Sequence, residues 1–357
     1  MSNRIVLACF VLLTVLASVS IWATSTPAAT QPQYKFRMQS IYTPGETGFK
    51  GTLTNFVKRV KAMSGGRIEI ELFSGGTLVP SIDTTAAVGK GTIDMGSASA
   101  AYISGVEPVA FTTLIPQGPR NAEDVMMIWK RGLGDLMSAA YDRQGAKLLG
   151  MMIVSDMPLY SRKPVRTLAD FKGLKIRTHS AMALFTEQLG ASNVFIPGGE
   201  VYMALSNGTV DAATWGNYAT MVDKKWYEVA KYVILPQIIY MFQNDDITIN
   251  KETFNKLPDD LKGILQSAAE AATWELVQGN MLANDAAWKT MESAGVKIIN
   301  LPPADVGKMI EAAKVVWDTL ASRGKDAYAG MKITTDYLRF KGYTDYDITK
   351  RSITVKQ

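Results

Sequence analysis

Gly91-Thr92-Ile93-Asp94-Met95 and Gly208-Thr209-Val210-Asp211-Ala212 are two copies of one five-residue pattern. A helical pattern precedes each copy, and a run of small residues follows it. Glycine ends a helix readily because it tolerates the left-handed conformation, and the following Ile or Val can open a strand. The repeat therefore predicts two lobes built on one plan. The alternative is a chance match over five residues.

Strand-like and helix-like patterns alternate from residue 34 onward. Residues 34–38 alternate apolar and charged side chains, and residues 53–63 place apolar side chains on one helical face. After Ser64-Gly65-Gly66, residues 68–72 alternate again. This β-α-β order predicts an α/β lobe with parallel strands and right-handed crossovers.

The later patterns predict how two lobes share the chain. Residues 121–143 are expected to form one helix, and residues 147–154 a strand that leads to the second lobe. Proline and two acidic residues at 258–260 predict the start of a long helix that spans both lobes. The expected parts are a signal peptide at 1–29, lobe 1 at 34–154 and 247–270, lobe 2 at 155–246, a long interlobe helix and C-terminal helices at 258–325, and a C-terminal extension at 326–357.

Within the second lobe, short apolar runs predict strands at 174–177, 194–196 and 212–215. Helices are expected between them, at 181–189 and 200–206.

The first residues predict export. Arg4 precedes an almost wholly apolar run from Ile5 to Ala23, followed by a small, polar stretch, which is typical of a secretory signal and of a periplasmic protein. An uncleaved membrane anchor is the alternative, because about 20 apolar residues suffice to span a bilayer. The only cysteine, Cys9, lies inside this run, so the mature chain is expected to lack disulfides.

Composition argues against nucleic-acid binding and against common enzyme chemistry. The net charge of +5 is mild, and no cluster of Lys and Arg with aromatic residues occurs, so we predict no nucleic-acid partner. The mature chain offers one histidine, His179, which we place on the rim or surface, and no thiol. The acidic pairs Asp245-Asp246 and Asp259-Asp260 are expected to be solvated or capping groups. Binding without reaction is the favoured interpretation.

A ligand in an open α/β sheet lies beyond the carboxyl ends of the strands. That rule places residues 97–102 of one lobe opposite residues 177–180 and 214–218 of the other. Arg177 ends an apolar strand, where its guanidinium could bind a carboxylate through two parallel hydrogen bonds. The alternative is a solvated arginine at a strand end.

Aromatic residues follow both copies of the repeat. Tyr102 follows the first, and Trp215 and Tyr218 follow the second, so they could enclose a small organic acid and exclude water. The alternative for each is ordinary packing. Tyr42, Trp226 and Trp274 are assigned to packing.

Taken in series, several short stretches resemble the solute receptors of tripartite ATP-independent periplasmic (TRAP) transporters. They are 64–67, 89–94, 163–165, 170–177, 189–191, 200–205 and 208–211. The resemblance implies an α/β, two-lobed periplasmic-binding-protein fold (type II-like) and a receptor for small organic carboxylates. Gln39-Ser40, Ala212-Ala213 and Trp215 resemble the branch that binds 2-oxo and hydroxy monocarboxylates.

The resemblance also implies roles for individual residues. An arginine matching Arg177 holds the carboxylate, a tyrosine matching Tyr102 reaches across from the first lobe, and a tryptophan matching Trp215 lines the site. The full set of expected ligand contacts is Arg177, Trp215, Tyr102, Asp156, Asn217, Tyr218 and Ser97.

Some members of the family bind calcium or sodium with the ligand. Where those members carry a glutamate, this chain has Thr214, and Asp156 stands about where they carry a glutamine. The expected ligands of such a cation are Asp156, Thr214 and Trp215, and no other cofactor is expected.

The family resemblance implies that the lobes close on the ligand and that the closed receptor docks on TRAP membrane subunits. A periplasmic sensor module with the same cleft is the alternative, followed by a periplasmic enzyme acting on organic acids. Relatives with a similar C-terminal extension pair through it, which predicts a homodimer.

Overall fold

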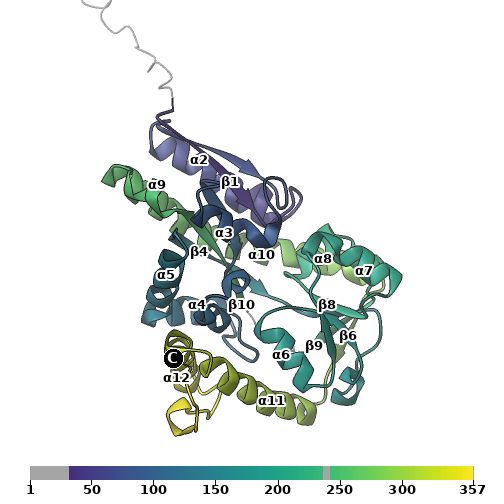
Figure 1. Ribbon diagram of the computed structural model, residues 1–357. Coiled ribbons are helices and arrows are strands. Elements are labelled where there is room, and N and C mark those ends of the chain that lie inside the picture. Colours follow the sequence, from purple (N-terminus) through teal and green to yellow (C-terminus); the bar gives the residue numbers. More distant parts are fainter. Residues whose placement is uncertain (1–31, 236–241, 357) are drawn as a thin grey trace, which may run out of the picture.

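The structure, a computed structural model, describes residues 32–235 and 242–356, with the side chains at 155, 156, 242 and 243 excepted. Two sheets organise these residues (Figure 1). The predicted signal peptide, its alternative as an anchor, and Cys9 lie outside the described residues. Among the described helices, none combines the length and the apolar character needed to cross a membrane.

The first sheet has the strand order β2-β1-β3-β10-β4. Strand β1 is parallel to β2 and β3, as the β-α-β pattern predicts, and β10 is antiparallel to both of its neighbours. The strands are β1 (Tyr34–Ser40), β2 (Ile68–Phe73), β3 (Met95–Ser99), β4 (Ala146–Asp156) and β10 (Phe242–Asn250). The predicted boundary between residues 246 and 247 falls inside β10.

The second sheet has the order β11-β9-β5-β8-β6-β7. Strand β5 is antiparallel to β8 and β9, whereas β6 is parallel to β7 and β8. The strands are β5 (Leu159–Ser161), β6 (Lys175–Arg177), β7 (Ser192–Val194), β8 (Ala212–Thr214), β9 (Tyr232–Leu235) and β11 (Lys297–Asn300). Strand β7 lies two residues before its predicted position.

Helices cover both sheets and join them. Those of the first lobe are α2 (Thr54–Met63), α3 (Thr84–Gly89), α4 (Ala122–Ile128), α5 (Gly134–Arg143) and α9 (Lys251–Asn255), with the short helices η1 (Gly48–Leu53), η2 (Ser81–Asp83), η3 (Ala100–Ile103), η4 (Pro108–Thr113) and η5 (Trp129–Leu133). Those of the second lobe are α6 (Ala181–Gln188), α7 (Val201–Asn207) and α8 (Tyr218–Asp223), with η6 (Leu168–Phe171), η7 (Gly198–Glu200) and η8 (Trp226–Glu228).

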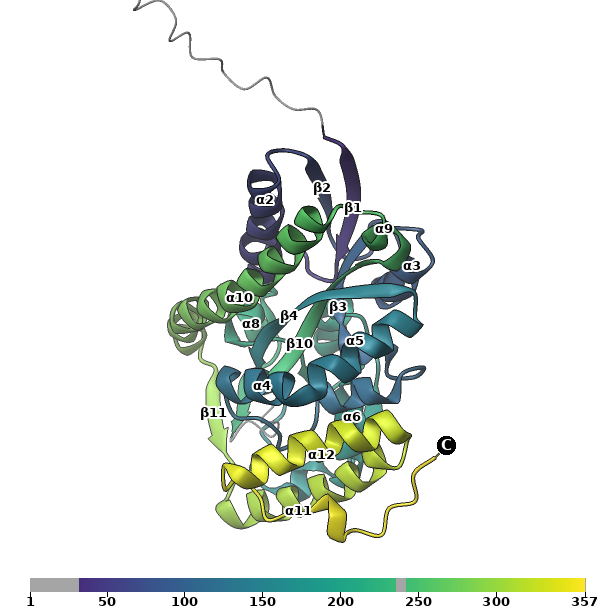
Figure 2. The ribbon, with the colours of Figure 1, turned by 90° about the vertical axis from the view of Figure 1, so that its left-hand side faces the viewer.

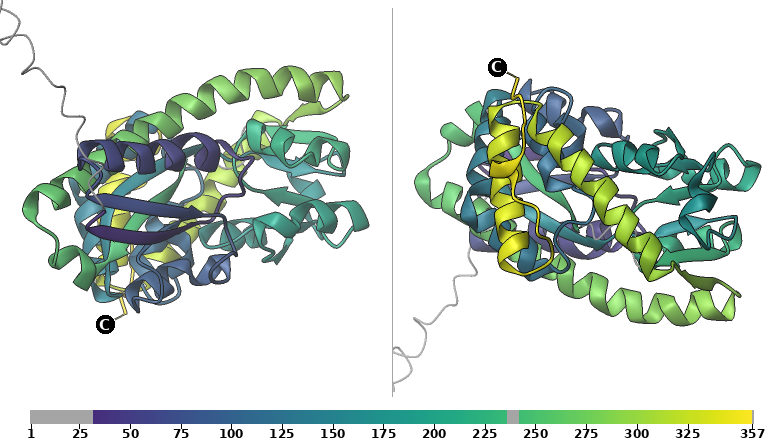
Figure 3. Two further views of the ribbon diagram at one scale, coloured as in Figure 1. Left: turned by 90° about the horizontal axis from the view of Figure 1, so that it is seen from above. Right: turned by 90° about the horizontal axis from the view of Figure 1, so that it is seen from below.

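The predicted long helix is α10 (Asp259–Ser293), whose 35 residues make it about 52 Å long. It packs on α2 and β4 of the first lobe and on α8 of the second, and it runs along one side of the molecule (Figure 3). Its Trp274 is 44% exposed, so the prediction that this residue packs inside was wrong.

The chain then crosses back to the first lobe. Helix α11 (Pro303–Ala321) contacts α6 and η4, and α12 (Lys325–Phe340) packs on α11 and η4 (Figure 2). The last segment, with η9 (Ile348–Lys350), returns to Ser322, whose carbonyl accepts a bond from the Lys356 amide.

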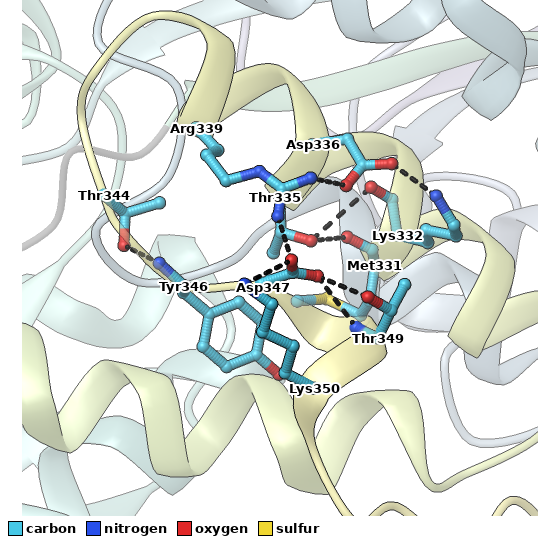
Figure 4. A network of polar contacts seen from close by, with 10 residues as sticks. All are labelled: Met331, Lys332, Thr335, Asp336, Arg339, Thr344, Tyr346, Asp347, Thr349 and Lys350. Atoms are coloured by element: carbon cyan, nitrogen blue, oxygen red, sulfur yellow. Dashed lines mark hydrogen bonds and ion pairs between the residues drawn. The ribbon is translucent and has the colours of Figure 1, made fainter.

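Polar contacts fasten this C-terminal segment to the same chain (Figure 4). Arg339 forms ion pairs with Asp336 and Asp347, and Asp347 in turn accepts bonds from Thr349. The Tyr346 hydroxyl donates to Asp318 at 2.7 Å. The extension is therefore a folded part of the protomer.

The two copies of the repeat have the same backbone geometry. Gly91 and Gly208 both have positive φ, 72° and 81°. Strands β3 and β8 begin four residues after each glycine; β3 begins two residues after Ile93, which was expected to open it, whereas β8 begins at Ala212, as predicted.

The aspartates of the two copies also make matching contacts. Asp94 accepts a bond from the backbone N–H of Arg37 at 2.7 Å, and Asp211 accepts one from that of Lys175 at 3.1 Å. Each N–H belongs to the parallel strand beside the copy, β1 or β6. One plan therefore underlies both lobes.

The single helix predicted over residues 121–143 is interrupted. Gly132 has φ 122° and breaks the helical conformation inside η5, between α4 and α5. Arg131, just before the break, lies over the rings of Tyr337 and Phe340, at 5.0 and 5.2 Å from their centroids. Contact with α12 thus accompanies a break that helical periodicity alone does not reveal.

Candidate functional site

Arg177 ends β6, as predicted, and is fully buried. Its Nε donates to the Ile196 carbonyl at 2.8 Å, and its Nη1 donates to the Thr214 carbonyl at 2.7 Å. Thr214 ends β8 and Ile196 follows β7, the two strands that flank β6, so the sheet itself fixes the plane of the guanidinium. Among the described residues, Nη2 has no hydrogen-bond partner.

The guanidinium is a buried charge without a buried counter-charge. Burial lowers the pKa of Arg177 to about 10, and Tyr102 acts in the opposite direction. The group therefore stays cationic at neutral pH. No described carboxylate forms an ion pair with it. A buried charge in this state costs free energy that an incoming anion would offset.

Aromatic rings surround the guanidinium. Its Cζ lies 4.8 Å from the centroid of Trp215 and 5.8 Å from that of Phe195. Trp215 packs closely on Gly198, where an added Cβ would lie 2.6 Å from the ring. A larger residue at 198 would therefore displace the ring that covers Arg177.

A pocket of about 320 Å³ lies beside these rings. It has walls from both lobes, because Tyr102 of the first lobe and Phe195 and Trp215 of the second all line it. Its lining residues are Ile41, Thr43, Gly75, Gly76, Pro80, Ser81, Ile82, Tyr102, Phe195, Pro197, Gly198, Gly199, Glu200 and Trp215. Arg177 does not line this pocket, but its guanidinium lies close to two of the lining rings, Trp215 and Phe195.

One buried ion pair connects the lobes near the site. Glu46, just before η1, lies 3.1 Å from the ammonium group of Lys224, which follows α8. The Glu46 side chain is 4% exposed and that of Lys224 is 11% exposed. Glu46 also accepts a bond from the Thr43 amide at 2.7 Å, so its orientation is fixed within the first lobe.

The sequence of residues 38–323 matches the family described as bacterial extracellular solute-binding protein, family 7. The chain belongs to family 7. The resemblance to TRAP solute receptors and the two-lobed fold predicted from the sequence are confirmed.

Individual relatives agree with this family. The monocarboxylate 2-oxoacid-binding periplasmic protein of Nostoc sp. is 28% identical over 320 residues, which cover 88% of this chain and 86% of the relative. A TRAP periplasmic solute-binding protein of Colwellia psychrerythraea, solved with calcium and pyruvate, has a TM-score of 0.80 at 23% identity and covers 87% of this chain and 96% of its own.

A second solved structure is a TRAP solute-binding protein of Bordetella bronchiseptica. It is a dimer with calcium and picolinate in one site, and it has a TM-score of 0.79 at 22% identity. The alignment covers 87% of this chain and 96% of that one.

In this family 7 chain, the other predicted ligand contacts lie in different surroundings. Ser97 is fully buried in β3, and its hydroxyl has no hydrogen-bond partner among the described residues. Asn217 caps α8 by accepting a bond from the Thr220 amide at 3.0 Å. The ring of Tyr218 packs edge-on against Trp288 at 5.8 Å. Contact of these residues with ligand stays a prediction.

The residues expected to hold a cation are described only in part. The Thr214 carbonyl accepts from Arg177, and its hydroxyl bonds to Thr178 at 3.1 Å. Asp156 ends β4, but its side chain lies outside the described part of the chain. Nowhere among the described residues do three His, Cys, Asp or Glu side chains gather as metal ligands.

Two predictions about polar residues were wrong. His179 is only 8% exposed and lies beside Arg177, not on the rim. Asp245 and Asp246 are each 1% exposed inside β10, not solvated. The apolar alternation of residues 247–249 directly after them was the available signal, because it places the pair within a strand.

Proposed function

We propose that this protein is the periplasmic solute receptor of a TRAP transporter and that Arg177 binds the carboxylate of a small organic acid. The observation that carries the proposal is the buried Nη2 of Arg177, which has no partner among the described residues. A carboxylate oxygen would complete its hydrogen bonding and neutralise its charge. Since two strand-end carbonyls already hold the guanidinium, little ordering would be needed on binding.

Closure of the lobes follows from the position of the pocket. Tyr102 comes from the first lobe, whereas Phe195 and Trp215 come from the second. A ligand between them touches both lobes only when they are closed, so it binds the closed state more tightly and shifts the population toward it. We propose that this closed state docks on the membrane subunits and that the acid is released there unchanged.

The relatives support a small monocarboxylate, in particular a 2-oxo or hydroxy acid. The name of the Nostoc protein specifies 2-oxo monocarboxylates, one solved neighbour holds pyruvate, and another holds picolinate. The pocket of about 320 Å³ beside the rings near Arg177 has room for acids of this size.

Carboxylate binding by Arg177 needs no metal ion in this proposal. Both Thr214 oxygens already take part in hydrogen bonds, with Arg177 and with Thr178. Isothermal titration of the acid with calcium, with sodium and with a chelator tests whether binding requires a metal ion. We expect equal affinities in all three conditions.

Removal of the guanidinium is the direct test. Arg177→Met should weaken binding of every carboxylate by about 100-fold or more, because charge-assisted hydrogen bonds are lost in a buried site. Isothermal titration against organic acids of three to six carbons measures this. Arg166→Met, which changes an exposed arginine of the same lobe, is the matched control and should bind like the wild type. Unchanged affinity in a folded Arg177→Met protein would refute the assignment.

Pairing through the C-terminal extension remains a prediction. The last part of the extension, residues 341–356, is held to Asp318 of α11 and to Arg339 of α12, and Figure 4 shows the contact with Arg339. Light scattering of the full chain and of a chain that ends at Phe340 would test it, with loss of a dimer in the shorter chain as the expected result.

A further inference from the structure

The connection between β6 and α6 contains two buried polar groups that the proposed function does not use. His179 is 8% exposed, and its Nδ1 has no hydrogen-bond partner within the described structure. The hydroxyl of Ser180 is likewise buried without a partner there. Buried polar atoms normally find partners in the protein or in bound molecules.

The backbone of this connection is strained. Ser180 has φ 56° and ψ −140°, a region that residues with a Cβ rarely occupy. Such conformations persist only where the surrounding structure imposes them, and they gather at binding and active sites. The strain therefore gives a second and independent indication that this connection serves a ligand.

His179 and Arg177 lie around the same small space. They are two residues apart, which limits their Cα separation to about 7 Å. The Phe195 ring is near both, with its centroid 5.8 Å from the guanidinium carbon and 6.4 Å from the imidazole centroid. Tyr102 of the other lobe faces the imidazole at 6.3 Å. If Arg177 holds the carboxylate of a ligand, the atoms next to that carboxylate would thus lie near His179.

The imidazole is neutral in this position. Burial lowers the pKa of His179 to about 3, and the positive charge of Arg177 adds to the effect. A neutral imidazole has one nitrogen that donates and one that accepts a hydrogen bond. It can therefore bind an uncharged oxygen of a ligand without opposing the cationic Arg177.

We infer that His179 is a specificity-determining residue that hydrogen-bonds, through Nδ1, the oxo or hydroxyl oxygen on the carbon next to the ligand carboxylate. This inference rests on the proposed function, in which Arg177 holds that carboxylate. Arg177 would then provide affinity for any small acid, and His179 would separate 2-oxo and 2-hydroxy acids from plain acids. A site with a polar group that matches a ligand oxygen discriminates strongly, because the wrong ligand leaves that group unpaired.

A comparison of matched acids tests the inference. The wild type is titrated with pyruvate, lactate and propionate, and then with 2-oxo, 2-hydroxy and unsubstituted acids of four to six carbons. The ratio of affinities gives the preference for 2-oxo and 2-hydroxy acids at each chain length. His179→Phe keeps a ring between Tyr102 and Phe195 but removes the nitrogen. We expect it to reduce that preference by about 10-fold and to leave propionate-type binding unchanged. His179→Gln, which keeps a polar group, should restore part of the preference.

The outcomes separate this inference from the proposed function. If His179→Phe retains the full preference for 2-oxo and 2-hydroxy acids, or weakens the binding of all three types of acid equally, the residue is structural and the inference is overturned. If the wild type binds no acid at all, the proposed function itself fails. Thermal unfolding of each variant without ligand establishes that the chain is folded.

Discussion

Two clusters of buried polar groups, one in each lobe, differ in their hydrogen bonding. In the first lobe, Asp245 accepts a hydrogen bond from Tyr42, and Asp246 accepts one from Tyr141 at 2.7 Å and one from Asn244 at 3.0 Å. In the second lobe, Arg177 Nη2, His179 Nδ1 and the Ser180 hydroxyl are equally buried but have no partner among the described residues.

This difference shows which of the two clusters has its hydrogen bonds satisfied within the protein. Paired groups in the first lobe satisfy one another, so they contribute to the folded state without any other molecule. Unpaired groups in the second lobe cost free energy until something else supplies their partners. The same kind of observation, a buried ionisable group, therefore indicates structure in one cluster and a ligand site in the other.

The largest expected effect tests whether Asp246 has a structural role rather than a role in ligand binding. Burial raises the pKa of Asp246 to about 7, with the bonds from Tyr141 and Asn244 opposing it. The folded protein then holds this proton more tightly than the unfolded chain between about pH 4 and pH 7. Its contribution to stability is present at low pH and is lost as the pH rises through 7.

Asp246→Asn removes this titration. We expect the free energy of unfolding of the variant, minus that of the wild type, to rise by about 1 kcal/mol per pH unit, or about 3 kcal/mol from pH 4 to pH 7. Urea unfolding across this range measures the difference. Asp135→Asn, at an exposed position of α5, is the control and should show no such trend. A constant difference for Asp246→Asn would mean that the aspartate is charged in the fold.

The second effect concerns the ion pair that joins the lobes. Lys224→Met leaves Glu46 buried without its cation, so we expect a loss of about 2 kcal/mol in the free energy of unfolding. Urea unfolding measures it, and Lys225→Met at the exposed neighbouring position is the control. If Glu46→Gln combined with Lys224→Met is no more stable than the single variant, the pair is not the cause.

The smallest effect tests the strain in the second lobe. Ser180→Gly should raise the free energy of unfolding by about 0.5 kcal/mol, because glycine adopts a positive φ without steric cost. Chemical unfolding without ligand measures the gain. Ser192→Gly, at an exposed strand position with ordinary geometry, should lower stability instead. A loss of stability in Ser180→Gly would show that the conformation is not strained.

Much of the fold follows from local pattern. The five-residue repeat locates β3 and β8, and the acidic start at 258–260 locates α10, because helix ends and strand periods depend on neighbouring residues. Arg177 was predicted for the same reason, since it ends an apolar strand.

The missed features depend on contacts between distant parts of the chain. Tyr141 and Asp246 are 105 residues apart, and Tyr42 and Asp245 are 203 apart. No local pattern reveals such pairs, so adjacent carboxylates inside a strand resembled solvated groups. The burial of His179 has the same origin, since Tyr102 from the other lobe covers it.

The order in which the strands of the two sheets follow one another along the chain has a consequence for folding. Strand β10 lies between β3 and β4 but follows the first five strands of the other sheet, and β11 completes that other sheet only after β10. A chain emerging from the ribosome cannot finish its first lobe before residue 250 or its second before residue 300. Both lobes therefore assemble late and together, and a fragment that stops before residue 242 leaves the edge of β3 open to misassembly.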